Sequence, residues 1–330
     1  MKDNNESIRT IGEFNLIESI KEHFPVPAGV TGIGDDCAVL PQKSGRETLV
    51  TTDMLMEGVH FLMEDADPYD LGWKSAAVNI SDIAAMGGVP VGTFLSFALP
   101  KTLTGAWVER FIEGYKAVSE LSGTPLLGGD TTSSLDRLCI NVTVLGECQA
   151  GASRKRSAAV PGDLICTTGY LGDSAGGLQV ILDEAAGRKE ARTDDEKELV
   201  RRHYQPVPRV SEGVVLAGTE GVHAMMDISD GVGSDLRHIL KASGVSAVID
   251  VSSIPVSDEL KRSAESRGWN VSELALNGGE DYELLFTISP EAERNLAVRH
   301  FVIGRITEGL NPGGVTWEGT DKEFKGFHHF

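Results

Sequence analysis

The sequence predicts a mixed α/β (α+β) protein made of two domains. Short runs rich in β-branched residues alternate with longer segments of helical periodicity, and the alternation continues through both halves of the chain. The chain has 330 residues, which is enough for two domains of ordinary size. A small, basic, loop-like segment, 149–163, separates the halves, so we expect domains at 1–148 and 149–330.

The first half contains both kinds of element in alternation. The expected helices are 13–24, 67–88 and 104–123. The expected strands are 47–53, 93–99, 125–132 and 138–147. Thr104 suits the N-terminal cap of the third helix and Gly123 its stop. The glycines of the third strand, 125–132, predict that it opens into a loop.

The second half repeats the alternation with more glycine turns. Residues 164–182 predict a strand, a glycine turn and a helix that starts near Ser174. Residues 223–244 predict a strand, an acidic loop and a helix, and 275–288 a loop that enters a strand. The highly charged segment 187–202 predicts a solvated helix, and the prolines that follow it predict a hinge.

Composition argues against several classes of function. The net charge of −19 and the pI of about 4.8 disfavour nucleic acid and anionic membranes as partners, because phosphate contacts need clustered Lys and Arg. No run approaches the ~20 apolar residues of a membrane span, and the N-terminus has no apolar signal segment. The four cysteines form no CxxC pair, which argues against a zinc site. We therefore expect a cytoplasmic protein.

Acidic residues gather where predicted strands end or glycine turns begin. The adjacent Asp35 and Asp36 follow the turn "GIG". The others in this setting are Asp53, Asp130, Asp227 and Asp230. Asp82 differs, because it lies within a predicted helix in "NISD". Ligand crevices form at strand ends of open α/β sheets, and carboxylates there suit Mg²⁺ bound together with phosphates. Any one of these residues alone could instead belong to a turn or a helix cap.

Other polar residues near this set are candidates for the same site. His60 lies seven positions past Asp53, close enough to line the same crevice, although a lone histidine is more often structural. Arg154 and Arg156 are among the few basic residues near the motifs, and forked guanidinium donors suit nucleotide phosphates. Cys37 next to the aspartates could be a reactive thiol or a small core residue.

Several well-known nucleotide motifs are absent. The sequence has no GxxxxGK[ST], no GxGxxG after a strand, and no kinase HRD or DFG pair. The segment "GDSAGG" does not fit the serine-nucleophile pattern GxSxG. A P-loop protein, a dinucleotide enzyme and a protein kinase are therefore disfavoured.

Seven motifs in order carry a family resemblance that covers essentially the whole chain. They are "GEFNLI", "GIGDDCAVL", "TTDMLMEGVHF", "KSAAVNISDIAAMGG", "GGDTT", "DISDGVGSDL" and "GGEDYELLFT". Together they resemble the thiamine-monophosphate kinase family, within the superfamily of aminoimidazole ribonucleotide synthetase. The resemblance implies two α/β domains, the first of which forms a β-barrel across a homodimer. It also implies ATP-dependent phosphorylation of thiamine monophosphate by direct in-line transfer, assisted by several Mg²⁺ ions.

The same resemblance implies roles for individual residues. The implied metal ligands and their neighbours are Asp36, Thr51, Thr52, Asp53, Asp82, Asp130, Asp227 and Asp230. The implied ATP contacts are Gly129, Asp130, Arg156, Ser229 and Ile112, with Arg154 as an alternative to Arg156. The implied contacts at the thiamine end are His60, Glu280 and Phe324. No general base is expected, because the acceptor is a phosphate monoester that is already anionic at neutral pH.

Other functions remain open on the sequence alone. Sister enzymes of the superfamily are disfavoured by the lack of an N-terminal reactive Cys with Lys and of a C-terminal cysteine. A metal-dependent phosphohydrolase could use the same carboxylates with water as the nucleophile. A cation-binding regulatory protein would bind nucleotide without turnover. ADP formation that depends on thiamine monophosphate separates the kinase from both.

Overall fold

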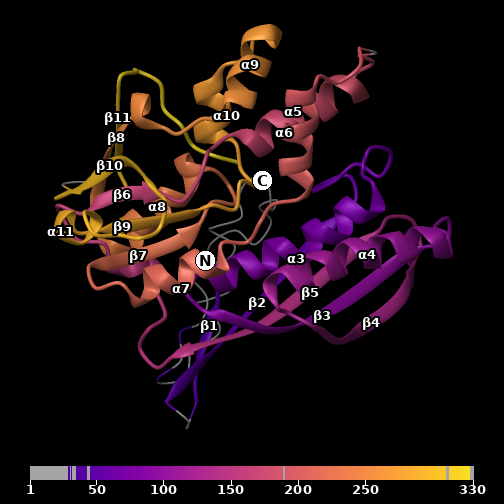
Figure 1. The fold of residues 1–330 in the computed structure, drawn as a ribbon, viewed down its shortest axis with the longest axis horizontal. Coiled ribbons are helices and arrows are strands. Elements are labelled where there is room, and N and C mark those ends of the chain that lie inside the picture. The colour runs from indigo at the N-terminus through magenta and orange to yellow at the C-terminus, as the bar shows by residue number, and fades with distance from the viewer. Residues whose placement is uncertain are drawn as a thin grey trace, which may run out of the picture.

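The protein consists of two α/β halves that lie side by side (Figure 1). In this computed structural model the described residues are 29, 31, 35–42, 45–188, 190–309 and 312–327. The helix expected over 13–24 lies outside these residues. Each half is built on its own sheet, and helices cover one or both faces, as the alternating sequence pattern predicts.

The first sheet has the strand order β1-β2-β5-β3-β4. Its strands are β1 (Ala38–Pro41), β2 (Arg46–Met56), β3 (Val89–Pro100), β4 (Leu126–Ser134) and β5 (Cys139–Gln149). Neighbours are antiparallel except β3 and β4, which are parallel. The expected loop at the glycines of β4 is wrong, because these residues continue to pair with β3 as far as Ser134.

This sheet is open, with β1 and β4 at its edges. The barrel expected from the family resemblance is therefore not formed within the described part of one chain. The sheet is half-buried, since alternate residues of β5 such as Ile140, Val142 and Val144 are fully buried while their neighbours are not. The buried side chains form one core with the helices that cover this face.

Two helices cover the inner face of the first sheet, α3 (Pro68–Ala85) and α4 (Gly105–Ser122) (Figure 1). The predicted caps of α4 are confirmed, because the Thr104 side chain accepts a bond from the Trp107 N–H and Gly123 adopts the left-handed conformation. The helices meet at two glycines. A Cβ atom would lie 1.9 Å from the Phe111 carbonyl oxygen at Gly72 and 1.8 Å from the Tyr69 carbonyl oxygen at Gly114.

The second sheet has the order β11-β8-β10-β6-β9-β7. Its strands are β6 (Leu164–Thr167), β7 (Val222–Asp227), β8 (Ser246–Asp250), β9 (Leu284–Ile288), β10 (Phe301–Thr307) and β11 (Val315–Glu318). Pairs are antiparallel apart from β11 with β8. Three of these strands were expected from the sequence, whereas β8, β10 and β11 were not.

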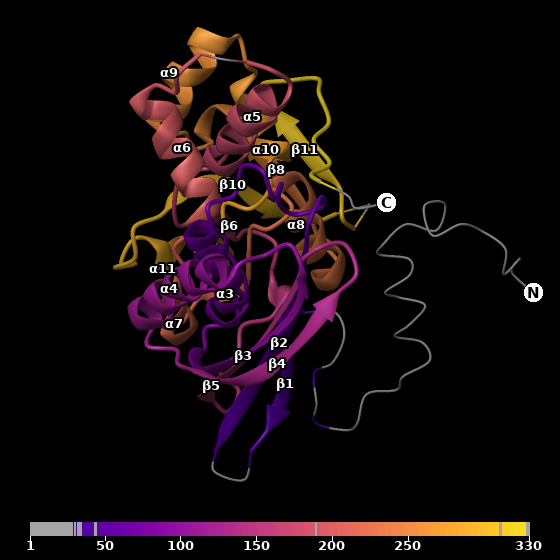
Figure 2. The ribbon, with the colours of Figure 1, turned by 90° about the vertical axis from the view of Figure 1, so that its right-hand side faces the viewer.

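The described residues of the second half form several helices. They are α5 (Asp173–Ala185), α6 (Asp194–Tyr204), α7 (Val210–Gly218), α8 (Val232–Ser243), α9 (Asp258–Arg267), α10 (Val271–Asn277) and α11 (Pro290–Glu293). Helices α5, α6 and α9 gather at the end remote from the β1 hairpin (Figure 2). Helix α6 begins later than expected, because a capping box of Thr193 and Glu196 fixes its start. None of the helices in the described ranges is both long and apolar enough to cross a membrane.

Helix α3 is shared between the halves. It packs against the first sheet and α4 on one side and against α6, α7 and β7 of the second half on the other. Thirteen of its eighteen residues are consequently buried, including polar ones such as Lys74 and Asn79. A helix enclosed in this way positions polar side chains between two domains, which is where the candidate site lies.

Candidate functional site

A cavity of about 830 Å³ lies between the two halves. Its walls come from the end of β2, from α3, from α5 and from the loops that follow β7 and α10. One region is lined by carboxylates and another by apolar side chains of α5 and the segment after β2. The cavity therefore suits a ligand that carries charge at one end and a ring at the other.

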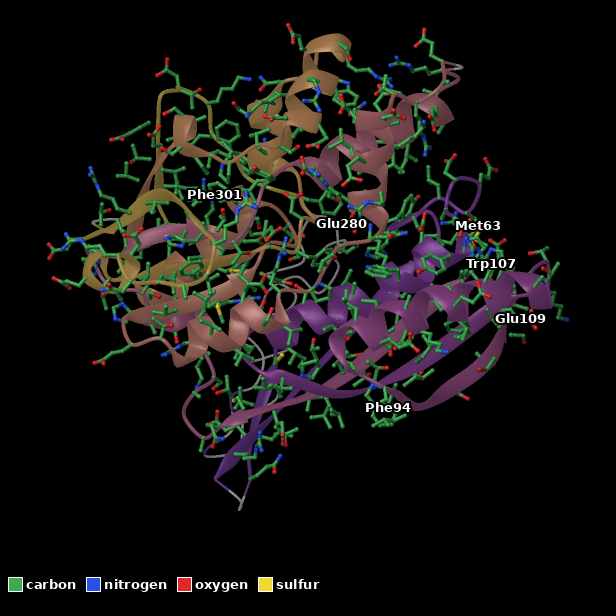
Figure 3. The ribbon with its side chains drawn as sticks, viewed as in Figure 1. Met63, Phe94, Trp107, Glu109, Glu280 and Phe301 are labelled. Atoms are coloured by element: carbon green, nitrogen blue, oxygen red, sulfur yellow. The ribbon has the colours of Figure 1, made fainter. Side chains whose placement is uncertain are left out.

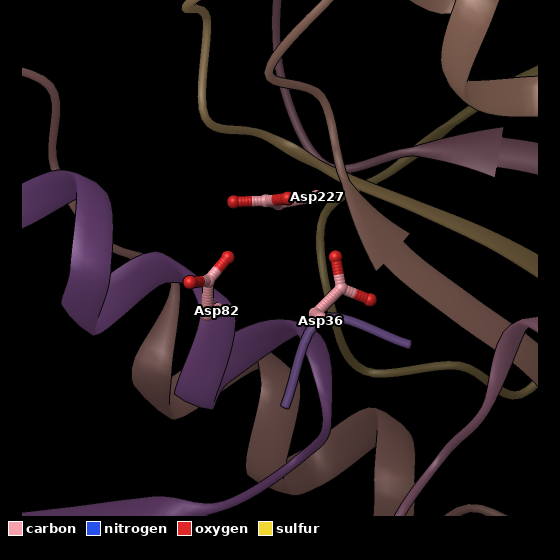
Figure 4. Close-up of side chains that lie close together, drawn as sticks. All are labelled: Asp36, Asp82 and Asp227. Carbon is pink, nitrogen blue, oxygen red and sulfur yellow. The ribbon is translucent and has the colours of Figure 1, made fainter. Parts of the chain in front are cut away.

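Three carboxylates from distant parts of the sequence meet at one end of the cavity (Figure 4). Asp36 precedes β1, Asp82 lies near the end of α3, and Asp227 is the last residue of β7. Each offers an oxygen, and the three oxygens all lie within 4.8 Å of one another. We refer to Asp36, Asp82 and Asp227 as the acidic cluster. This spacing allows three monodentate ligands to one divalent cation.

The cluster is electrostatically strained without a counter-ion. Burial, with repulsion from Asp36 and Asp53, raises the pKa of Asp227 to about 8. Burial and the neighbouring carboxylates raise the pKa of Asp82 well above its usual range. The pKa of Asp53 rises to about 6 because the surrounding protein displaces water and because Asp36 and Asp230 repel it. Three crowded carboxylates that share one arginine as their nearest cation are typical of cation sites.

Neighbouring side chains fix the direction of these carboxylates. The Ser81 hydroxyl donates to Asp227 Oδ2 at 2.5 Å, and the Thr51 hydroxyl donates to Asp82. The backbone N–H of Asp53 donates to Asn79 Oδ1 at 2.9 Å. Because Ser81 and Asn79 both lie on α3, this helix sets the geometry of the site.

Arg156 is the cation nearest to the acidic cluster. Its Nη2 donates to Asp36 Oδ1 at 2.8 Å, and its backbone N–H donates to Asp35 Oδ1 at 2.9 Å. Arg154 points elsewhere, since its Nη2 donates to the Ala217 carbonyl at 2.6 Å. Of the two arginines considered from the sequence, the structure therefore brings Arg156 to the cavity.

Cys37 is buried beside the same carboxylates. Its Sγ–H donates to the backbone carbonyl of Asp82 at 3.4 Å, and the side chain is 2% exposed. Burial and the surrounding negative charges raise the pKa of its thiol well above the ordinary value. The structure therefore favours a small core residue over a reactive thiol.

Glu280, which lies between the two halves, also lines the cavity (Figure 3). Glu280 adopts a left-handed backbone conformation with φ of 64°, which is unusual for a residue with a side chain. Its carboxylate pairs with the buried Lys74 ammonium at 3.0 Å, and this ion pair lowers the pKa of Glu280 against the effect of burial. His60 also lines the cavity, and its Nδ1 accepts a bond from the Met56 N–H at 3.0 Å.

Most of the residues expected from the sequence line this one cavity. They are Asp36, Thr51, Thr52, Asp53, His60, Asp82, Arg156, Asp227, Ser229, Asp230 and Glu280. Phe324 does not, because it is 1% exposed and its ring packs edge-on against Trp317 with centroids 5.0 Å apart. Phe327, three residues later, lines the cavity instead.

Three further expected residues lie outside the cavity lining. Gly129 and Asp130 are exposed on β4, at the edge of the first sheet, and Ile112 is 38% exposed on α4. Gly129 is required there by a φ of 152° and by the Leu95 carbonyl oxygen, which would lie 1.8 Å from a Cβ atom. Within one chain the structure does not bring these residues to the acidic cluster.

Several residues at the cavity were not predicted from the sequence. Lys74, Ser174, His203 and Tyr282 belong to the cavity or support it. The signal for Lys74 was its place at the start of "KSAAVNISD", eight residues before Asp82. His203 gave no local signal, because it lies in a charged helix that reads as solvated.

Comparison with known proteins agrees with this geometry. The family model described as AIR synthase related protein, N-terminal domain, matches residues 34–148, and that of the corresponding C-terminal domain matches 160–313. A thiamine-monophosphate kinase of Bacillus subtilis is 38% identical over 299 residues, which cover 89% of this chain and 90% of the relative. One from Aquifex aeolicus is 38% identical and covers 98% of this chain and 99% of its own. The chain belongs to the thiamine-monophosphate kinase family.

Solved structures of this family share the fold. "AaThiL complexed with AMPPCP and TMP" superposes with a TM-score of 0.89 at 37% identity and covers 99% of this chain and 100% of its own. The thiamine monophosphate kinase of Aquifex aeolicus gives a TM-score of 0.84 at 36% identity, covering 96% and 100%. A HypE–HypF complex gives a TM-score of 0.71 at 20% identity, covering 94% and 99%, and shows the fold alone. The mixed α/β, two-domain class predicted from the sequence is confirmed.

Proposed function

We propose that the protein transfers the γ-phosphate of ATP to thiamine monophosphate and releases ADP and thiamine diphosphate. Its relatives bear the name of this activity, and the AaThiL structure holds AMPPCP and TMP together. One observation carries the proposal: a single cavity is lined by the acidic cluster, by apolar side chains of α5 and by Glu280. Such a cavity can hold phosphates at one end and a heterocycle at the other.

The acidic cluster fits Mg²⁺. Its oxygens are close enough to share an ion, and the raised pKa of Asp227 marks a carboxylate whose charge a cation would stabilise. The residues that would hold the ions are Asp36, Thr51, Thr52, Asp53, Asp82, Asp227 and Asp230. Bound Mg²⁺ would neutralise the two phosphate chains and align them for transfer.

The chain's own groups would orient both substrates. Arg156 has forked donors that now bind Asp36 and would turn to nucleotide phosphates, while Ser229 offers a hydroxyl beside them. The acceptor phosphate needs little deprotonation, so direct in-line transfer requires no general base. Of the other lining residues, His60, Glu280 and, in place of Phe324, Phe327 would contact the thiamine moiety.

We also propose that the active form is a homodimer in which β4 pairs with a second copy. Strand β4 is a nine-residue edge strand that exposes Leu126 (42%) and Leu127 (56%). Long exposed edges with apolar side chains are usually covered. A second copy would close the first domain, 1–148, into a barrel and leave 149–330 outside it. It would also explain why Gly129 and Asp130 lie away from the cavity of their own chain.

The test is an assay of ADP release with ATP and Mg²⁺, with and without thiamine monophosphate, and with the thiamine product read by chromatography. We expect thiamine diphosphate in step with ADP. Asp36→Asn should lower turnover by orders of magnitude, far more than it lowers folding stability, and Asp136→Asn, at a side chain 91% exposed, is the matched control. If the rate of ADP release does not depend on thiamine monophosphate, the result would support a phosphohydrolase and refute the kinase activity.

A further inference from the structure

Behind Glu280 lies a chain of buried polar contacts that the proposed transfer does not use. Lys74, on α3, is fully buried, with Nζ 3.0 Å from Glu280 and 3.3 Å from His203 Nε2. The other ring nitrogen, His203 Nδ1, lies 2.9 Å from the Ser174 hydroxyl oxygen. Ser174 lines the cavity. The contacts therefore run from a buried ammonium to a hydroxyl at the cavity wall.

The direction of these hydrogen bonds follows from the donors available. An ammonium group only donates, so His203 Nε2 must accept from Lys74. His203 is 2% exposed, and burial together with Lys74 lowers its pKa to about 3, so the ring is neutral. A neutral ring that accepts at Nε2 carries its proton on Nδ1. The Glu280 carboxylate is 3.6 Å from Nδ1, too far for a hydrogen bond, whereas the Ser174 oxygen is within range.

The Ser174 hydroxyl therefore cannot donate to the protonated Nδ1 of His203, which leaves its own hydrogen to be donated elsewhere. None of the hydrogen bonds between described residues gives the Ser174 hydroxyl hydrogen an acceptor. The backbone around Ser174 is fixed, because the Asp281 carboxylate accepts from the N–H groups of Gly172 at 2.7 Å and Ser174 at 3.1 Å. The result is an oriented donor at the cavity wall that needs an acceptor from a ligand.

Apolar side chains line the cavity beside this donor. Leu178, Ile181 and Leu182 of α5 line the cavity next to Ser174, and Tyr204 completes this part of the wall. An apolar wall with one aimed donor suits a flat heterocycle that accepts at a ring nitrogen. Thiamine monophosphate contains such a ring in its aminopyrimidine.

We propose that Ser174 donates a hydrogen bond to a pyrimidine nitrogen of the acceptor substrate, and that Lys74 and His203 are positioning residues that hold its hydroxyl in the donating orientation. The inference deepens the proposed function and rests on it. It assigns Lys74 a second role besides the ion pair with Glu280, namely the choice of the His203 tautomer. Ser174 is then a determinant of specificity for the ring rather than for the phosphates.

The decisive experiment compares Ser174→Ala with the wild type on thiamine monophosphate and on two analogues in which one pyrimidine nitrogen is replaced by CH. With the natural substrate, Ser174→Ala should raise KM for thiamine monophosphate about 3- to 10-fold, the effect of one neutral hydrogen bond, and leave KM for ATP unchanged. With the one analogue that lacks the accepting nitrogen, wild type and variant should be equal. Ser211→Ala, at an exposed serine of α7, is the matched control.

Each outcome decides a different point. An equal effect of Ser174→Ala on the natural substrate and on both analogues would overturn the inference while the wild-type activity still stands. A wild type without thiamine diphosphate formation would instead refute the proposed function.

The role of Lys74 can be tested in the wild-type protein by measuring which ring nitrogen of His203 carries the proton. Nitrogen NMR of ¹⁵N-histidine-labelled wild type, with the His203 signal assigned by its loss in His203→Asn, should show the proton on Nδ1. A proton on Nε2 would overturn the relay. Lys74→Met should raise KM for thiamine monophosphate and broaden or shift the His203 signal, and Lys74→Arg should restore part of the affinity because it keeps a buried donor. An unchanged tautomer in a folded Lys74→Met protein would also refute the relay.

Discussion

The crowding of the acidic cluster predicts that a carboxylate can be removed with a gain in stability. The change is Asp227→Asn, which keeps the shape of the side chain and an acceptor for Ser81 but removes the charge. Folding raises the pKa of Asp227 from 3.8 to about 8, so between these values the folded state holds a proton that the unfolded chain has lost. The free energy of unfolding of the wild type, without metal, therefore falls as pH rises through this window.

The magnitude follows from the same shift. About three pH units separate 3.8 from neutrality, and each is worth about 1.4 kcal/mol, so the cost at pH 7 is up to about 4 kcal/mol. Asp227→Asn should be more stable than the wild type by a few kcal/mol at pH 8, and the gain should shrink toward pH 4. Added Mg²⁺ should reverse the order, because only the wild type keeps the full set of ligands.

The assay is urea unfolding in EDTA at several pH values between 4 and 8.5, repeated with Mg²⁺. Asp136→Asn serves as the control for the loss of one carboxylate, since this side chain is 91% exposed and lies outside the cluster. A loss of stability in Asp227→Asn at pH 8 in EDTA, or a difference that does not vary with pH, would refute the reasoning about the cluster.

Three other predictions concern the scaffold. Leu127→Asp should convert the proposed dimer to monomers in sedimentation velocity and lower activity, and an unchanged oligomeric state would exclude β4 as the interface. Phe111→Ala should lower the free energy of unfolding by about 3–5 kcal/mol, because this fully buried ring contacts Phe97 at a centroid distance of 4.7 Å. Gly114→Ala should separate α3 from α4 and lower the thermal midpoint by several degrees, since a Cβ atom there meets backbone at 1.8 Å. A wild-type midpoint in Gly114→Ala would show that the helices can move apart at little cost.

Two members of the acidic cluster were predictable from the local sequence pattern. Asp36 and Asp227 occupy the ends of predicted strands or glycine turns, and strand ends in α/β sheets converge on ligand sites. Asp82 lies on a helix, so only its place in a family motif suggested it. Helix caps such as Thr104 and Gly123 were equally visible, because their chemistry is local.

The other features of the fold and the site could not be predicted, because they depend on tertiary packing. Lys74 looks like a surface residue by local pattern, yet it is fully buried because α3 is enclosed by both halves. Phe324 and Phe327 lie in a tail without regular structure, so no periodicity tells which of them faces the core. Strands β8, β10 and β11 were missed because they are only four to seven residues long, too short for an alternating pattern to stand out.

Helix α3 fixes the distance between two residues that contact different parts of the site. Lys74 and Asp82 are eight residues apart on it, which corresponds to about 12 Å along the axis. Lys74 pairs with Glu280, which we propose contacts the thiamine ring, and Asp82 belongs to the acidic cluster, which we propose binds the phosphates with Mg²⁺. The span between them is thus set by the backbone of one rigid element rather than by a loop. If both proposed contacts are made, a substrate with a shorter or longer arm between its ring and its phosphate would reach only one of the two residues, and the spacing along the helix would select substrates by length.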